Sequence, residues 1–347
     1  MAYSILQCDI RKCKEDIISL WRRNFQGVLE QRYSWIYENN PAGSAICYLL
    51  KDDERNKIVG AVTLIPRKII LNGKPINASI IADLSIDKDI RSQGYGFSLI
   101  KSLDTICDGK RFSMLYAFPY EASGPIFRKA EYEILSEIHE MTKILRSHYY
   151  IKKNIDYPIL TRILSSIVDF IIHYNPKTIF KKHLREYSLE KLTYFDKRFD
   201  DLWEKVSTQF TLIGERSCSF LNWRFKEAPD KYNIFALTSN SGSHILGYVI
   251  STASQTRVHI ADIVFLNDSI LNALLLLYFR HQRAKGVDAV TITIAANPLL
   301  INKFKYNGFS VRSKIGRVVI NMSSKINFTS QEIKKKKWYL MTVDNDV

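Results

Sequence analysis

The sequence predicts a mixed α+β chain built from two tandem copies of one fold, each a mixed, mostly antiparallel sheet flanked by helices. Its 347 residues are many for a single hydrophobic core, so two domains are expected. A hydrophobic fraction of 46% and a charged fraction of 24% are those of an ordinary globular protein. Three segments of the first half also recur in the second half, in the same order.

The recurring segments define the domain organisation. The matched pairs are Ile58–Thr63 with Ile245–Ile250, Ile80–Leu84 with His259–Ile263, and Phe127–Tyr132 with Phe304–Phe309. Any one match would be weak, but three in order and at similar spacing indicate a duplicated unit. We therefore divide the chain into a first domain at 1–150, a helical connector at 151–185 and a second domain at 186–347.

Periodicity places the elements of the first copy. Helical spacing covers Glu15–Phe25, Gly96–Asp108 and Gly124–Ala130. Strand patterns cover Ser44–Leu50, Ile58–Ile65, Ala78–Ile86 and Phe112–Phe118. Asn72-Gly73 favours a tight turn with positive φ, so a hairpin is expected between Arg67–Leu71 and Lys74–Ile76. A final pair of strands is expected up to about residue 147.

The connector interrupts this alternation of predicted strands and helices. Ile159–Ile172 predicts a strongly apolar helix that Asn175-Pro176 ends, and the basic stretch Lys177–Arg185 follows. In the second copy, Ile270–Phe279 is apolar but far shorter than the roughly 20 residues that span a bilayer. The N-terminus has no apolar signal region, so no membrane insertion is expected.

The cysteine pattern and the net charge indicate in which cellular compartment the protein works and which partners it can bind. The five cysteines (8, 13, 47, 107 and 218) form no Cys-x-x-Cys pair, which predicts a reduced, cytoplasmic protein without a metal site. The net charge of +15 fits nucleic acid, an anionic membrane surface or phosphorylated small molecules. Basic residues are spread along the chain, and the one dense run, Lys334–Lys337, is typical of a solvated turn. Nucleic acid is therefore not expected as a partner.

A glycine-containing loop, Arg91-Ser92-Gln93-Gly94-Tyr95-Gly96, joins the strand Ala78–Ile86 to the following helix. Glycines let backbone N–H groups approach a phosphate, and a helix N-terminus adds unpaired donors and partial positive charge. The loop therefore predicts a pyrophosphate cradle with Arg91 at its rim. The spacing of a dinucleotide loop and that of a P-loop are both absent. A plain turn at a helix start is the remaining alternative.

The segment Ala82–Leu103, which contains this loop, resembles the GNAT family of acyl-CoA-dependent N-acyltransferases. Phe118-Pro119 and Phe127–Tyr132 resemble later segments of that family, so the resemblance covers most of residues 1–147. It implies acyl-CoA as co-substrate and no metal. It also implies that the pantetheine arm contacts the backbone of Leu84, Ser85 and Ile86. The pyrophosphate would be bound by the loop residues Arg91, Ser92, Gln93, Gly94, Tyr95 and Gly96. Ser123 and Phe127 would lie beside the thioester.

The chain also departs from this family. Many members have a tyrosine where Phe127 stands, and phenylalanine cannot protonate a leaving thiolate. Tyr120 is therefore the candidate acid, with Tyr116 as its alternative. Asp83 is the candidate base because an attacking amine must lose a proton, and a buried structural aspartate is the alternative. The second copy has Phe265–Leu271 in place of the glycine loop, so one CoA site per chain is expected.

Candidate acceptor contacts come from the second copy. Arg216, Trp223 and Arg224 suit phosphate binding and stacking on a base or sugar, with a core tryptophan as the alternative. Asp262 is the counterpart of Asp83, and His259 lies on the same strand.

The stretches Glu215–Phe225 and Trp338–Asp346 resemble a subgroup of tandem GNAT proteins associated with bacterial surface polysaccharide synthesis. That resemblance implies acyl transfer by direct attack of the amino group of a nucleotide-linked deoxyamino sugar, with dTDP as the nucleotide. An acceptor of another kind (a peptide, an aminoglycoside or a cell-wall precursor) stays open, as do a non-catalytic CoA-binding protein and homo-oligomerisation.

Overall fold

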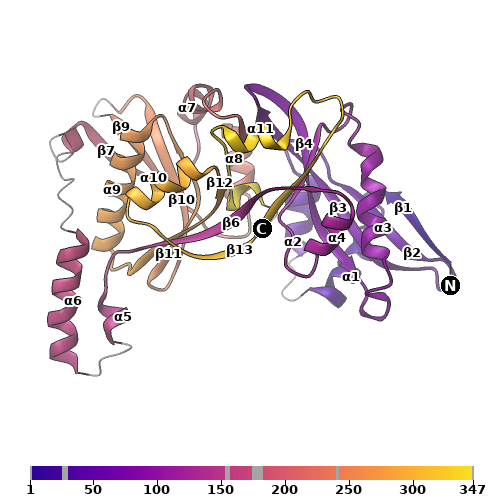
Figure 1. The fold of residues 1–347 in the computed structure, drawn as a ribbon, viewed down its shortest axis with the longest axis horizontal. Helices are drawn as coiled ribbons and strands as arrows, with labels where there is room; N and C mark the ends of the chain where they lie inside the picture. Colours follow the sequence, from indigo (N-terminus) through magenta and orange to yellow (C-terminus); the bar gives the residue numbers. More distant parts are fainter. Residues whose placement is uncertain (1, 26–29, 153–156, 174–182, 240–241, 346–347) are drawn as a thin grey trace.

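The computed structural model describes residues 2–25, 30–152, 157–173, 183–239 and 242–345 and contains one large mixed sheet with helices packed against it (Figure 1). In sheet order, the strands are β1 (Tyr3–Cys8), β2 (Ile46–Asp52), β3 (Lys57–Leu71), β4 (Lys74–Ile86), β5 (Met114–Ala117), β13 (Ser310–Met322), β6 (Glu133–Ile144), β12 (Ala289–Ala296), β11 (Arg257–Phe265), β10 (Ile245–Ser254), β9 (Asn233–Ser239) and β7 (Tyr187–Leu192). Two short strands lie off this path, β8 (Leu212–Gly214) beside β3 and β14 (Tyr339–Met341) beside β12.

The helices connect and cover these strands. In chain order, the α-helices are α1 (Lys14–Asn24), α2 (Glu30–Tyr33), α3 (Tyr95–Ser102), α4 (Gly124–Lys129), α5 (His148–Lys152), α6 (Pro158–His173), α7 (Lys197–Ser207), α8 (Cys218–Phe225), α9 (Asp268–Ala284), α10 (Pro298–Tyr306) and α11 (Ser330–Lys335). Shorter helical turns are the π-helix η1 (Ser34–Glu38) and the 3₁₀ turns η2 (Lys88–Ile90), η3 (Leu103–Ile106), η5 (His183–Glu186) and η6 (Thr342–Asp344).

The predicted mixed α and β class is confirmed, and most local elements lie close to the predicted ranges. The predicted turn at Asn72-Gly73 is present, because both residues have positive φ angles of 50° and 76°. The strands around it are longer than expected. Strand β3 joins a predicted strand to one hairpin arm, and β4 joins the other arm to the next strand. The predicted apolar helix of the connector is α6.

Two local expectations were wrong. Strand β1 pairs with β2 at one edge of the sheet but was not predicted. The expected pair of strands before residue 147 is the single strand β6. Its neighbour in the sheet is β13, which comes from the second half of the chain. A periodicity argument cannot supply a partner that lies far away in the sequence.

The two halves exchange one strand each. Strand β13 lies between β5 and β6, where Val319 pairs with Ala117 and Val318 with Ser136. Strand β6 in turn pairs with β12, where Met141 faces Ile292. Each half therefore completes its part of the sheet with a strand of the other half. The boundaries at 150 and 185 stay a prediction, and residues 177–182 of the basic stretch lie outside the described residues.

Two apolar clusters form the core. One lies under α3 and α4 and includes Leu99, Ile100 and Phe127. The other runs through both halves of the sheet and includes Trp35 and Trp223. In the described part of the chain, no helix is long and apolar enough to cross a membrane.

Candidate functional site

The predicted cradle lies at the N-terminus of α3. Gly94 precedes the helix with a φ of +92°, and a Cβ built there would meet no atom within 4 Å. No side chain caps α3, so its first N–H groups are available to a bound anion. The preceding residues 91–93 are exposed. This arrangement has the open space and the free donors that a pyrophosphate needs.

Neighbouring contacts fix the shape of this loop. Arg91 donates to the carbonyl of Ile86 (2.9 Å) and to Oδ1 of Asn24 on α1 (2.7 Å). Gly96 packs closely on α4, since a Cβ there would lie 2.9 Å from Cδ1 of Ile126 and the end of that side chain would have to shift. The remaining predicted loop residues support the turn. Ser92 has a φ of 68°, and the Gln93 amide lies 3.5 Å from the Asp89 carbonyl. Tyr95 packs on Tyr3.

The pairing of the sheet is interrupted next to this loop, and this interruption is called the gap between β4 and β5. Strands β4 and β5 run parallel and pair only over Ala78–Ile80, although β4 continues to Ile86. A bulge follows, because Asp83 and Leu84 together face Val62 of β3. Along this edge the backbone of Leu84, Ser85 and Ile86 has no strand partner on the β5 side among the described residues. The predicted pantetheine contacts therefore lie on a free strand edge.

Asp83 lies in this bulge and is held by two residues that sequence reasoning missed. Its φ is 51°, and its Oδ2 accepts hydrogen bonds from Arg32 (2.9 Å) and Tyr37 (2.8 Å). Burial, and next the charge of Asp83, hold the pKa of Tyr37 well above its ordinary value, so Tyr37 keeps its proton. Tyr37 also lies 2.7 Å from Oγ1 of Thr63. The carboxylate is thus fixed in position, which suits either a structural role or a positioned base.

The candidate acids differ in their surroundings. Tyr120 lies after β5 and is 77% exposed, and its carbonyl accepts the Oγ hydrogen bond of Ser123 at 3.2 Å. Tyr116 is buried and donates to the carbonyl of Asp344 (3.0 Å). Phe127 is buried in the cluster under α3, with its ring against Tyr132. Phe127 therefore belongs to the core, and its place beside a thioester stays a prediction.

The residues expected to bind an acceptor lie mostly in the interior. Arg216 has no exposed side-chain surface and donates to Asp262 (2.9 Å) and to both carboxylate oxygens of Asp344 (2.8 and 2.7 Å). Tyr248 donates to the same Oδ2 of Asp262 at 2.8 Å. Burial raises the pKa of Asp262, and the adjacent guanidinium opposes that rise. Arg216 and Asp262 therefore hold the C-terminal segment, and this corrects their expected contact with an acceptor.

Trp223 and Arg224 join the two halves. Trp223 donates its indole N–H to the carbonyl of Trp35 (2.8 Å), and Trp35 donates back to the carbonyl of Trp223 (2.7 Å). Both tryptophans and Arg224 are buried, and the Arg224 guanidinium lies 5.2 Å from the centre of the Trp35 ring. Neither Trp223 nor Arg224 has an open face for stacking on a base or sugar. These contacts fit the alternative interpretation of the sequence, in which Trp223 is a tryptophan of the core.

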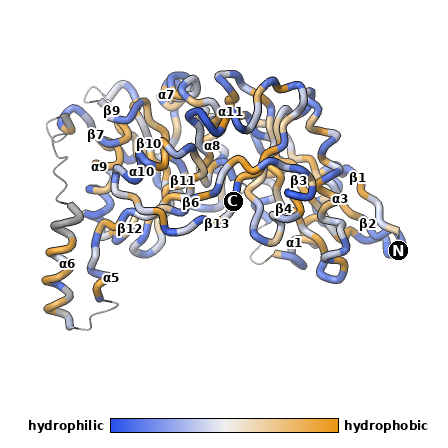
Figure 2. The backbone as a smooth tube through the Cα atoms, in the orientation of Figure 1, coloured by the Kyte–Doolittle hydropathy of each residue, from blue (hydrophilic) through white to orange (hydrophobic). Residues whose placement is uncertain are grey.

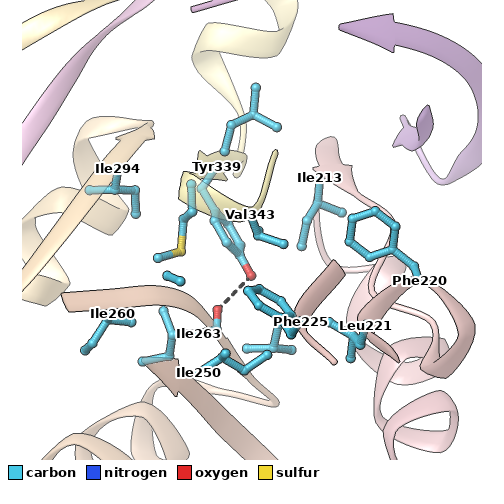
Figure 3. Packing of buried hydrophobic residues seen from close by; sticks show 14 of the residues in the cluster. Ile213, Phe220, Leu221, Phe225, Ile250, Ile260, Ile263, Ile294, Tyr339 and Val343 are labelled. Atoms are coloured by element: carbon cyan, nitrogen blue, oxygen red, sulfur yellow. Dashed lines mark hydrogen bonds between the residues drawn. The ribbon is translucent and has the colours of Figure 1, made fainter. Parts of the chain in front are cut away.

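The corresponding gap of the second half is filled by the chain itself. Strands β11 and β12 are also parallel and pair only over Arg257–Ile260, and the bulge in β11 follows. Here β14 pairs with β12, and Tyr339 donates to the carbonyl of Ile263 at 3.0 Å. Figure 3 shows Tyr339 and Val343 among apolar side chains of the neighbouring strands and α8. His259, half-buried, bonds Thr342 and Thr291 at 3.0 and 3.1 Å.

The helix after this second gap is also closed to a ligand. Asn267 caps α9, because its side chain accepts from the backbone N–H of Ile270 at 3.1 Å. A side chain therefore caps the N-terminus of α9 but not that of α3. This difference is consistent with the expectation of one cradle per chain. In the described residues, no group of three or more His, Cys, Asp or Glu side chains is placed to hold a metal ion.

Comparison with known proteins finds a known domain in the first half of the chain. Residues 11–135 match the family model of the acetyltransferase (GNAT) domain. That match supports an acyl-CoA-dependent N-acyltransferase. No curated protein matches the chain.

Solved structures share the fold over most of this chain. A GCN5-related N-acetyltransferase from Anabaena variabilis is 15% identical, with a TM-score of 0.65 over 92% of this chain and 73% of that one. A conserved Enterococcus faecalis protein of unknown function, a probable N-acyltransferase, is 14% identical, with a TM-score of 0.65 over 93% and 72%. N-myristoyltransferase from Saccharomyces cerevisiae with bound myristoyl-CoA is 13% identical, with a TM-score of 0.56 over 96% and 84%. At these identities the likeness concerns the fold.

The structural role of Arg216 can be tested by Arg216→Met. The change leaves two buried carboxylates without their cation, so we expect unfolding free energy to fall by about 3–5 kcal/mol in a urea titration. The matched control is Arg198→Met, which breaks the more exposed Arg198–Asp196 pair and is expected to cost about 1 kcal/mol or less. Unchanged stability of Arg216→Met, together with a raised acceptor KM, would instead favour acceptor contact.

Proposed function

We propose that this protein transfers an acyl group from acyl-CoA to the amino group of a nucleotide-linked deoxyamino sugar, with dTDP as the expected nucleotide. One observation carries the acyl-CoA part. An open, uncapped helix N-terminus lies beside a free strand edge, within the region that matches the GNAT domain. The amino-sugar part rests on the resemblance of Glu215–Phe225 and Trp338–Asp346 to a tandem GNAT subgroup. The net charge of +15 suits a diphosphate-linked acceptor.

The residues of the chain suit direct attack. Acyl-CoA would supply the thioester, and the backbone of β4 and the α3 N-terminus would bind and orient it. Arg32 and Tyr37 both bind Oδ2 of Asp83, so Oδ1 is the oxygen that we propose takes the proton of the amine. Tyr120 is exposed beside Ser123 and is the proposed source of a proton for the thiolate.

A covalent enzyme intermediate is not favoured. Burial raises the pKa of Cys13 to about 12 and that of Cys107 to about 11, and it raises the pKa of Cys218 as well. These thiols therefore stay protonated at neutral pH, and the thiol is a far weaker nucleophile than the thiolate. A thiolate leaving group also needs little help, because its pKa is far below that of an alkoxide.

The acceptor is tested by a thiol-release assay on the full chain, with several acyl-CoAs against dTDP-amino sugars, aminoglycosides and peptides. We expect release with an amino sugar, and none with the same nucleotide sugar carrying a hydroxyl in place of the amine. Turnover of a peptide or an aminoglycoside without turnover of any amino sugar would replace the acceptor and keep the acyltransferase. CoA binding without turnover of any amine would favour the non-catalytic alternative.

The cradle is tested by Gly94→Val. Valine at a φ of +92° adds strain and puts two methyl groups where the pyrophosphate is expected, so affinity for CoA should fall more than about tenfold. The matched control is Gly73→Val in the β3–β4 turn, whose φ is +76° and whose Cβ would also meet no atom within 4 Å. Both variants should lose similar stability. Equal CoA affinities by calorimetry would show that the loop is misassigned.

The base is tested by Asp83→Asn. Removing a general base typically costs about 10²–10⁴ in rate, so we expect kcat to fall about 100-fold with little change in the KM for acyl-CoA. Asp52→Asn is the matched control, because Asp52 is buried on β2 and its described side-chain partners, two turn N–H groups and Arg55 at 3.8 Å, all lie in the adjoining turn. An unchanged kcat in Asp83→Asn would leave Asp83 a structural role.

A further inference from the structure

Helix α6 is set apart from the rest of the molecule. It extends away from the sheet at one end of the molecule, beside α5, and apolar positions recur along it (Figures 1 and 2). Its described contacts lie on one side. Ser165 is buried there, and its carbonyl accepts a hydrogen bond from Oγ of Ser147 at 3.2 Å.

The side of α6 away from this contact is apolar and open. Ile159 is 78% exposed, Ile163 53% and Ile167 51%, and steps of four residues place them along one helix face. Leu160, 46% exposed, widens that face, and Tyr157 just before the helix is 73% exposed. These five residues are called the α6 apolar face. Exposed apolar residues of this size are ordinary when scattered but mark an interaction surface when contiguous.

The surroundings of the α6 apolar face are basic. Arg162 lies on α6 and Lys152 on α5, and both are exposed. The sequence from 145 to 173 has four lysines and arginines against two aspartates, Asp156 and Asp169. At the base of α5, Arg146 donates to the carbonyl of Gly286 at 3.0 Å and pairs with Asp288 at 3.8 Å, and the exposed Lys285 precedes Gly286. The whole chain carries a net charge of +15.

We propose that the α6 apolar face binds the surface of an anionic lipid bilayer, with the helix lying in the plane of the headgroups. An apolar stripe flanked by basic side chains is the pattern of such interfacial helices. Sixteen residues make a helix of about 24 Å, too short to span a hydrocarbon core of about 30 Å. A second copy of the chain is the competing occupant, and a stable dimer would need about 800 Å² of buried surface per partner.

The test is co-sedimentation of the full chain with vesicles of equal parts phosphatidylcholine and phosphatidylglycerol. We expect binding that weakens at high salt and on vesicles of phosphatidylcholine alone. The triple variant Ile159→Ser, Ile163→Ser and Ile167→Ser should lower the partition coefficient more than about tenfold, because it removes the apolar area that inserts. The double variant Arg162→Glu and Lys152→Glu should weaken binding to anionic vesicles only.

The matched control is Leu299→Ser with Ile315→Ser, which replaces two similarly exposed apolar residues on other elements and should leave vesicle binding unchanged. Thermal unfolding and CoA affinity confirm that each variant is folded. Absence of vesicle binding by the wild-type chain, or equal binding by the triple variant, would overturn the proposal. So would sedimentation velocity showing a wild-type dimer that the triple variant converts to monomer, since the face would then join two copies.

Discussion

The candidate site depends on the divergence of two parallel strands. Strands β4 and β5 stay paired for three residues, and β4 then bulges at Asp83 and continues beside β3 without a strand on its β5 side among the described residues. A bulge bends its strand and leaves backbone groups unpaired, and such groups need a partner. The free edge of β4 leads directly to the open N-terminus of α3. Strand edge and helix end thus offer donors to the two parts of one extended ligand.

The second half repeats this divergence with the opposite outcome. Strand β11 also bulges beside its parallel neighbour β12, but β14 occupies the space and Arg216 fixes Asp344 behind it. A buried guanidinium is tolerated there because two carboxylates share its donors. One copy of the fold is therefore open at its gap, and the other is closed by its own chain.

Sequence reasoning succeeded where the cause is local. The Asn72-Gly73 turn and the loop around Gly94 follow from glycine and asparagine at positive φ, a property of single residues. It did not find Arg32 and Tyr37, because the π-helix η1 that carries Tyr37 has no periodic signal and contacts β4 only through the tertiary fold. Arg216 and Trp223 were recognised as special, but residue type alone does not reveal burial.

Because β6 and β13 are exchanged between the halves, part of the sheet cannot form until late in the synthesis of the chain. Ala117 of β5 finds its partner Val319 only about 200 residues later in the chain. At about 5–20 residues per second, the ribosome needs roughly 10–40 s to make that stretch. Until then the edges of β5 and β6 face each other without the strand that separates them, and open edges invite wrong pairings. A chaperone that shields the nascent N-terminal half would act in this interval, and contacts this distant in sequence also slow folding in free solution.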